Sequence, residues 1–296
     1  MFNLLHQLRT GGDHSFDDIM SVGQHFIELS GLGDPNALNR PQFGEPPRLF
    51  FSHAFPWNLP AFRRAIYVVR NPEDVLRSWY HLIHQFFQLN QQIEFEDFFF
   101  YCFLYNCFWP DEPYFHHIAV YWKLSYNFNQ GIIPRKATRN NEIRTGKRNS
   151  NDVSSLFAWF HFEDLVDEEK LRDIFRKIAY HLNITNHKEK TLLRRISRGY
   201  YLRNQRKFDI HEIQYVAGYI INQCVTKERY RMNIADENAL GIKSVYVSNR
   251  TIAVSERFRQ ILTSKWASIV QPATGFNSYD HMLAESKNHM FIFAGS

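Results

Sequence analysis

Three side chains in the first third of the sequence could together bind an anion and move a proton. Arg70 ends a short apolar run and Ser78 follows eight residues later, so a fixed cation and a hydroxyl could share one anionic group. An ion pair between Arg70 and Glu73 or Asp74 explains the arginine equally well. His53 could act as a general base, because an imidazole with a pKa of about 6.5 is neutral and basic at physiological pH.

The elements around these residues are those of an α/β protein. Ala65–Val69 is a continuous β-branched and aromatic run, apolar on both faces and too short for a helix, as buried parallel strands are. Pro72 suits the first position of a helix, and Glu73 and Asp74 suit the positive end of its dipole. A strand that turns directly into a helix places Arg70 at the carboxyl edge of the sheet, where open α/β folds bind ligands.

The same alternation of strands and helices continues along the chain. Arg48–His53 is expected to be a short strand, and His53 could simply be a satisfied histidine at its end. Leu156–Phe160 is a second buried-type strand, and Asp167–Leu182 follows as an amphipathic helix. This order predicts a right-handed, mostly parallel sheet covered by helices. Further helices are expected over Phe95–Phe108 and Pro113–Phe128 and after Ser255, which could cap one.

The run RNPEDVLRSWYH, which begins at Arg70, resembles the RNPxDVxxSxYH signature of sulfotransferases. These enzymes transfer a sulfonate group from 3′-phosphoadenylyl sulfate (PAPS), and their arginine and serine hold the 3′-phosphate of the nucleotide. Arg70 and Ser78 match both at the family's spacing. The resemblance implies a three-layer α/β sandwich with a mostly parallel central sheet, the P-loop nucleoside-triphosphate-hydrolase-like sulfotransferase fold. It implies PAPS as co-substrate and no metal.

Several positions extend or depart from this resemblance. His53 matches the family's general base, whereas Phe51 stands where the family has a lysine near the sulfonate. Phe162 replaces a tyrosine that contacts the nucleotide, so it could pack on a ring but could not donate a hydrogen bond. Met1 falls about where the loop that cradles the 5′-phosphosulfate would close. We therefore expect the first strand and that loop to be missing from the given sequence and to lie just upstream of Met1.

Composition limits the class of protein. The chain has 296 residues and a formal charge of +5 (35 basic minus 30 acidic), which fits one large α/β domain with an anionic ligand. No long basic block is interleaved with aromatic residues, so nucleic acid is not an expected partner. Three cysteines without metal spacing indicate a reducing compartment. The most apolar stretch, Phe98–Phe108, is shorter than the roughly 20 residues of a membrane span, so we expect a cytoplasmic protein.

The chain is expected to form a single sulfotransferase-like domain over residues 1–286. Residues 129–153 are rich in Arg, Lys, Asn and Ser and carry no apolar period, so they are expected to be a solvated basic insertion loop. Residues 287–296 are expected to be a tail. A homodimer is left open.

The favoured function is PAPS-dependent sulfonate transfer to a hydroxyl or amine of a small, apolar or aromatic acceptor. An alternative is a catalytically inactive nucleotide-binding or scaffold protein on the same fold, which the replacement at Phe51 favours. A third class, polyanion binding through basic segments, leaves Arg70, Ser78 and His53 unexplained. The aromatic wall of the acceptor pocket is expected to draw on Trp57, Phe86, Phe99 and Trp122.

Overall fold

The structure is a computed structural model. It describes residues 64–87, 94–104, 114–129, 157–184 and 252–289, and single positions or short runs between residues 5 and 59. The chain divides into two compact units, each assembled from separate stretches of sequence. The sheet unit comprises residues 55–70, 115–185 and 263–296, and the helical unit comprises residues 1–54, 71–114 and 186–262.

Two parallel strands form the centre of the sheet unit. Strand β1 (Ala65–Val69) pairs with β2 (Phe157–His161), from Ala65 opposite Phe157 to Val69 opposite His161. The predicted first strand is confirmed at both ends, and the second begins and ends one residue later than predicted. Every residue of β2 is buried, whereas most of β1 is half-buried. The parallel pairing confirms the α/β character of the chain, and a wider central sheet stays a prediction.

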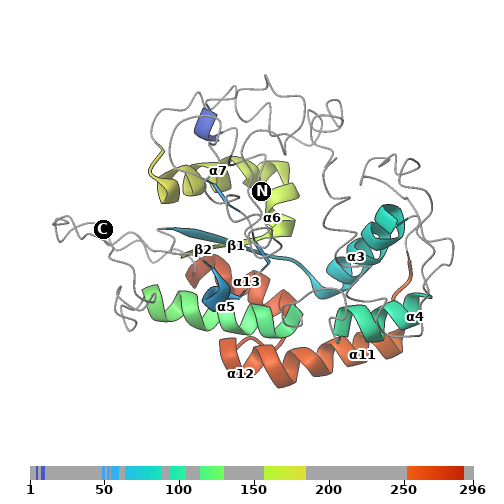
Figure 1. Ribbon diagram of the computed structural model, residues 1–296. Helices are drawn as coiled ribbons and strands as arrows, with labels where there is room; N and C mark the ends of the chain where they lie inside the picture. Colours follow the sequence, from blue (N-terminus) through green and yellow to red (C-terminus); the bar gives the residue numbers. More distant parts are fainter. Residues whose placement is uncertain are drawn as a thin grey trace. The chain divides into compact units, whose positions relative to one another are not determined.

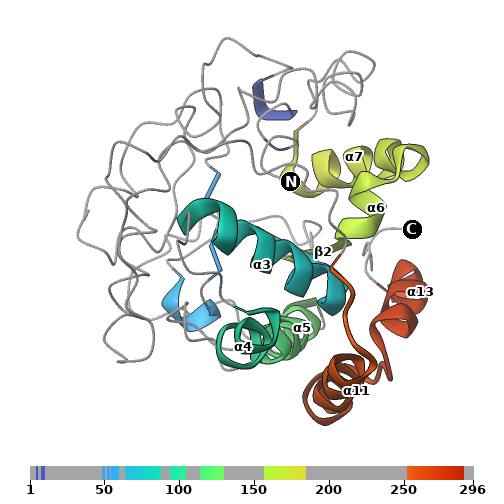
Figure 2. The ribbon, with the colours of Figure 1, turned by 90° about the vertical axis from the view of Figure 1, so that its right-hand side faces the viewer.

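Helices cover both faces of this strand pair. Helix α5 (Tyr114–Asn129) lies on one face and α7 (Glu168–Leu182) on the other, as Figures 1 and 2 both show. Because side chains alternate along a strand, the register partners Tyr67 and Trp159 point to the same face, where they stack on each other 4.3 Å apart. Tyr67 also meets Tyr121 of α5 at 4.8 Å, so aromatic packing joins that helix to the sheet.

Helix α7 begins one residue later than predicted, at Glu168, and ends at Leu182 as predicted. Asp167 caps it by accepting a hydrogen bond from the Glu169 backbone N–H at 3.0 Å, and Asn183 ends it in the left-handed conformation at φ 58°. Its predicted apolar face is buried throughout, at Leu171, Ile174, Phe175 and Ile178.

The C-terminal part of the sheet unit is a chain of short helices. The segments η6 (Trp266–Val270) and α12 (Gln271–Thr274) run on from helix α11 (Glu256–Lys265), and Gly275 then stops the helix at φ 83°. The Trp266 indole N–H donates to the Phe276 carbonyl at 2.9 Å, which fixes the turn into α13 (Tyr279–His289). Helix α13 thus includes residues 287–289, the first three residues of the expected tail.

In the helical unit, α3 (Pro72–Phe87) follows β1 after a two-residue turn. Asn71 caps α3 by accepting a hydrogen bond from the Glu73 N–H at 2.9 Å, and Pro72 opens the helix as predicted. The expected aromatic helix begins at Phe95, as α4 (Phe95–Asp97) and the π-helix η3 (Phe98–Leu104). The Ser255 hydroxyl accepts from the Phe258 N–H at 3.3 Å and so caps α11, as its sequence predicts.

One predicted strand is wrong in the described positions. Leu49, Phe50, Ser52 and His53 lie in irregular chain rather than in a strand. A strand needs a hydrogen-bonded neighbour, and in the part of the sheet that the structure describes β1 pairs with β2. The remainder of the basic insertion after residue 129, the segment from 188 to 250 and the last residues of the expected tail lie outside the described residues.

Candidate functional site

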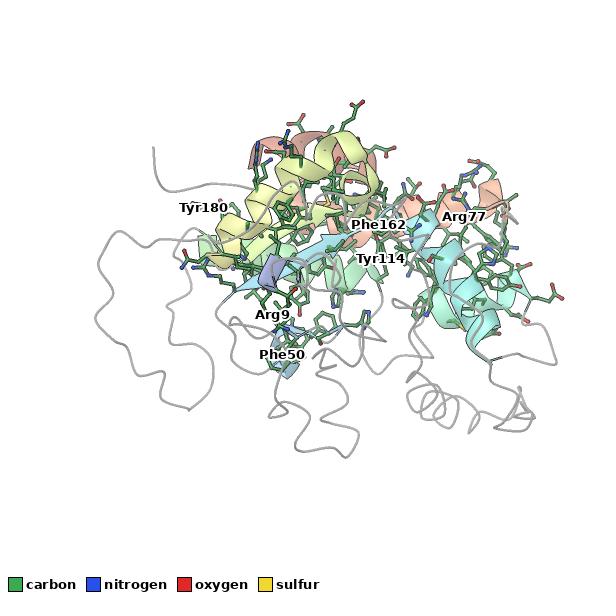
Figure 3. All side chains as sticks on the ribbon, turned by 90° about the horizontal axis from the view of Figure 1, so that it is seen from above. Arg9, Phe50, Arg77, Tyr114, Phe162 and Tyr180 are labelled. Carbon is green, nitrogen blue, oxygen red and sulfur yellow. The ribbon has the colours of Figure 1, made fainter. Side chains whose placement is uncertain are left out.

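Arg70 and Phe162 meet at the carboxyl edge of the sheet unit. Each directly follows the last residue of its strand, Val69 in β1 and His161 in β2, and those two residues are register partners. The guanidinium carbon of Arg70 lies 4.4 Å from the centroid of the Phe162 ring. This is a cation–π contact, in which the negative face of the ring attracts the cation. Figure 3 labels Phe162 at this end of the sheet.

The contact with Phe162 is compatible with anion binding by Arg70. A ring beneath the guanidinium interacts with its charge and its face, whereas hydrogen bonds to a phosphate use its in-plane N–H groups. Phe162 thereby restricts the orientation of a long side chain without using its donors. A restricted arginine loses less conformational entropy when it binds an anion.

Behind Phe162, a hydrogen-bonded chain joins β2 to α13 through Tyr279. The Tyr279 hydroxyl donates to the Glu163 carboxylate, in the first turn of α6 (Phe162–Val166). His161 Nδ1 lies 3.1 Å from the same hydroxyl oxygen. Because the phenol proton goes to Glu163, the Nδ1 of His161 carries the proton that completes this chain.

This cluster fixes the backbone on both sides of Phe162. His161 and Tyr279 are buried, so loss of either polar partner would remove a hydrogen bond from the interior of the sheet unit. Sequence reasoning did not find the cluster, since Tyr279 lies 116 residues from Glu163.

A second aromatic group in the sheet unit leads to an exposed tryptophan. Tyr67 hydrogen-bonds to His117 Nδ1 at 2.8 Å, and burial raises the pKa of its phenol well above the ordinary value, with a further contribution from Tyr121. The His117 ring lies 5.3 Å from Phe55, which stacks on Trp57 at 4.4 Å. Trp57 is 66% exposed, so it presents a flat aromatic face to solvent.

Two other residues expected around the acceptor pack against neighbouring rings. Trp122 meets Trp159 and Phe276 edge-on in the sheet unit, each at 5.1 Å. Phe99 is fully buried in the helical unit, where it stacks on Phe258 at 4.3 Å. Phe99 therefore fills the core of that unit. The side chain of Phe86 lies outside the described residues.

In the helical unit, Ser78 is exposed on α3 and a polar network surrounds the preceding residue, Arg77. Arg77 donates to Glu73 Oε2 and to Asp74 Oδ1, each at 2.9 Å, and Glu73 also accepts from Arg259 at 3.1 Å. The two carboxylates considered as partners of Arg70 are thus bound by Arg77.

His53 is exposed in irregular chain and belongs to the helical unit, as Ser78 does. Arg70 is the last residue of a stretch of the sheet unit. The structure therefore describes the environment of each candidate residue within its own unit. Their roles stay predictions.

The described residues contain neither a group of metal ligands nor a membrane span. Within them, the acidic, histidine and cysteine side chains form no group of three or more that could hold a metal ion. Over the same stretches, none of the helices combines the length and the apolar character needed to cross a bilayer.

Comparison with protein families confirms the resemblance seen in the sequence. Residues 25–133 match the family model described as the sulfotransferase domain, which is consistent with a member of the sulfotransferase family and implies a P-loop-like α/β fold. The matched range contains His53, Arg70 and Ser78. The search of curated proteins found no match.

Proposed function

We propose that the protein transfers a sulfonate group from PAPS to a hydroxyl or amine of a small, apolar or aromatic acceptor. The match to a sulfotransferase domain supports sulfotransfer in general. The choice of donor rests on Arg70 and Ser78, and the choice of reaction on His53. We place this activity in the cytoplasm, with a small-molecule acceptor and without nucleic acid or membrane as partner.

Arg70 and Ser78 hold the 3′-phosphate of the nucleotide in this proposal. The observation that carries it is the position of Arg70, at the carboxyl end of a parallel strand with its guanidinium 4.4 Å from the ring centroid of Phe162. Ligands of open α/β folds bind at this edge, and arginine gives a phosphate both charge and directed hydrogen bonds. Ser78 adds an exposed hydroxyl from the helix that follows.

His53 takes the proton of the acceptor as the sulfonate group arrives. PAPS supplies the activated sulfonate and a good leaving group, so the protein contributes positioning, a base and positive charge. His53 lies in an exposed position, where a base that acts on a bound acceptor would be placed. Trp57 offers an exposed ring on which an aromatic acceptor could stack.

Titration calorimetry with adenosine 3′,5′-bisphosphate tests the nucleotide site. The wild-type chain should bind, and Arg70→Ala should weaken binding by about 10- to 100-fold, the size expected when one charged hydrogen-bonding partner is lost. Arg64→Ala is the matched control, because it removes the same charge just before the other end of β1. If both variants weaken nucleotide binding equally, or if neither weakens it, Arg70 does not bind the nucleotide.

A catalytically inactive nucleotide-binding protein is the second candidate function. One observation favours it: Phe51 occupies the position at which the family has a lysine, so a cation is missing near the transferring sulfonate. On this alternative the bisphosphate would still bind and depend on Arg70, whereas no sulfonate would transfer from PAPS to any of a panel of phenols, alcohols and amines. Measurable transfer would exclude the alternative.

A further inference from the structure

Arg77 connects two parts of the helical unit at the turn of α3 that carries Ser78. Its Nε–H donates to the Ile252 carbonyl at 3.1 Å, and its two terminal nitrogens donate to Glu73 and Asp74. Arg77, labelled in Figure 3, therefore reaches from α3 to the chain that leads into α11. A planar guanidinium held at three nitrogens has its orientation fixed.

The two carboxylates that Arg77 binds lie close to Ser78 on the helix. Asp74 precedes Ser78 by four residues, so both lie on one face of α3, about one turn apart. Glu73 lies one residue earlier. An anion bound at the Ser78 hydroxyl would be repelled by any carboxylate left uncompensated there, because like charges about 6 Å apart interact by roughly 1 kcal/mol or more at a partly exposed site.

The ion pairs of Arg77 contribute little to the stability of the folded protein. The side chains of Arg77, Glu73 and Asp74 are 25%, 26% and 42% exposed, and ion pairs of such exposure contribute about 0–1 kcal/mol. The network also has an electrostatic effect, since one cation at 2.9 Å from each acid offsets part of their negative field. The Ile252 carbonyl holds the guanidinium in the orientation that serves both acids.

We propose that Arg77 is a positioning residue for the 3′-phosphate: it offsets part of the negative charge of Glu73 and Asp74, and so lets the Ser78 turn of α3 accept a dianion. This inference rests on the proposed function and adds a residue that the sulfotransferase resemblance does not assign. Arg77 acts through the two acids and does not itself touch the nucleotide. Arg259 assists by forming a second ion pair with Glu73.

The test measures binding of adenosine 3′,5′-bisphosphate and of adenosine 5′-phosphate to the full 296-residue chain. Arg77→Met keeps the packing of the aliphatic stem but removes the charge. It should weaken binding of the bisphosphate about fivefold to tenfold and leave binding of the monophosphate unchanged, since only the former carries the 3′-phosphate. Arg257→Met is the matched control, because it removes an exposed arginine that pairs with Glu96 on the same unit.

Rescue separates the electrostatic role from a structural one. Adding Asp74→Asn to Arg77→Met removes the uncompensated charge and should restore most of the lost affinity, with circular dichroism used to check that each variant folds. Weakening without rescue, equal weakening for both nucleotides, or an effect equal to that of Arg257→Met would overturn this inference alone. If the wild-type chain fails to bind the bisphosphate, the proposed function is overturned first and the role of Arg77 with it.

Discussion

At the scale of single residues, Arg70 and Phe162 illustrate how a replaced side chain can keep a contact in a site while losing a hydrogen bond. The sequence led us to expect that Phe162 could pack on a ring but could not replace the hydrogen bond of a tyrosine. In the structure its ring lies under a cation instead, with the Arg70 guanidinium carbon 4.4 Å from the centroid. A phenyl ring therefore orients the arginine that we propose to bind phosphate.

His53 gives the sharpest test of chemistry at this scale. His53→Ala should lower the rate of sulfonate transfer by about 100-fold or more, the usual contribution of a general base, because no other described group is assigned to take the acceptor's proton. Affinity for adenosine 3′,5′-bisphosphate should stay within about twofold of the wild type. The measurement is a radiolabelled transfer assay alongside calorimetry.

A control for this test is another exposed histidine. His116 lies on α5 in the sheet unit, and His116→Ala should leave both rate and affinity unchanged. If His53→Ala transfers sulfonate as fast as the wild type, His53 is not the general base. The assignment of the nucleotide site would be unaffected.

At the scale of elements, the aromatic richness of the chain explains how short helices are held together. Phe258 of α11 stacks on Phe99 at 4.3 Å and lies 5.9 Å from Phe95. On the other side of the same cluster, Phe98 meets Trp79 and Tyr80 of α3 edge-on. The π-helix η3 is thus fixed between two helices by ring contacts.

Phe258→Ala should therefore destabilise the helical unit strongly. A buried phenylalanine truncated to alanine leaves a cavity and costs about 3–5 kcal/mol, to be measured as a lower midpoint of urea unfolding. Phe258→Leu fills most of that volume and should cost clearly less. A loss below about 1 kcal/mol for the alanine variant would show that the ring contacts at Phe258 contribute little to the unit.

At the scale of the whole molecule, the sheet unit carries a built-in dependence on pH. His181 of α7 is buried, and its Nε2–H donates to the Ala65 carbonyl at 3.1 Å. Burial, with the nearby charge of Arg64, lowers the pKa of His181 to about 4, although the hydrogen bond to Ala65 acts in the opposite direction. The imidazole is therefore neutral in the folded protein at neutral pH.

Because the pKa of His181 is lowered in the folded protein, the fold becomes less stable as the pH falls. Between pH 6.5 and about 4 the unfolded chain binds a proton at His181 that the folded chain does not, so the free energy of unfolding falls as pH falls through that window. At about 1.4 kcal/mol per unit, the total loss is at most about 3 kcal/mol, reached near pH 4. His181→Gln keeps a donor for Ala65 but cannot ionise, so its unfolding free energy should change less across the same window.

Urea unfolding at pH 7 and pH 4.5 measures this difference. His116→Gln is the control, because that side chain is exposed on α5 and should leave the pH dependence as in the wild type. The same pH dependence in His181→Gln and the wild type would contradict the assignment to His181.

The sequence predicted several strands, helices and caps correctly, because these elements depend on neighbouring residues. Four such features depend on residues within a few positions of one another: the β-branched run of β1, the proline and acids that open α3, the cap of α11 and the apolar face of α7. The signature from Arg70 to Ser78 is local too, and its resemblance to the sulfotransferase signature agrees with the domain match over residues 25–133. The strand expected to end at His53 was wrong, because pairing depends on a neighbour that its own residues do not specify.

The tertiary structure decided which distant groups meet. Three contacts show this. Arg70 meets Phe162, which is 92 positions away (162 − 70), and Tyr279 donates to Glu163, which is 116 positions away. Arg77 donates to Ile252, which is 175 positions away. No periodicity or spacing reports such pairs, since they follow from how strands register and helices pack. The sequence by itself therefore determined the chemistry that Arg70, Ser78 and His53 could perform. Only the fold decided what holds Arg70 in place and which charges surround the turn that carries Ser78.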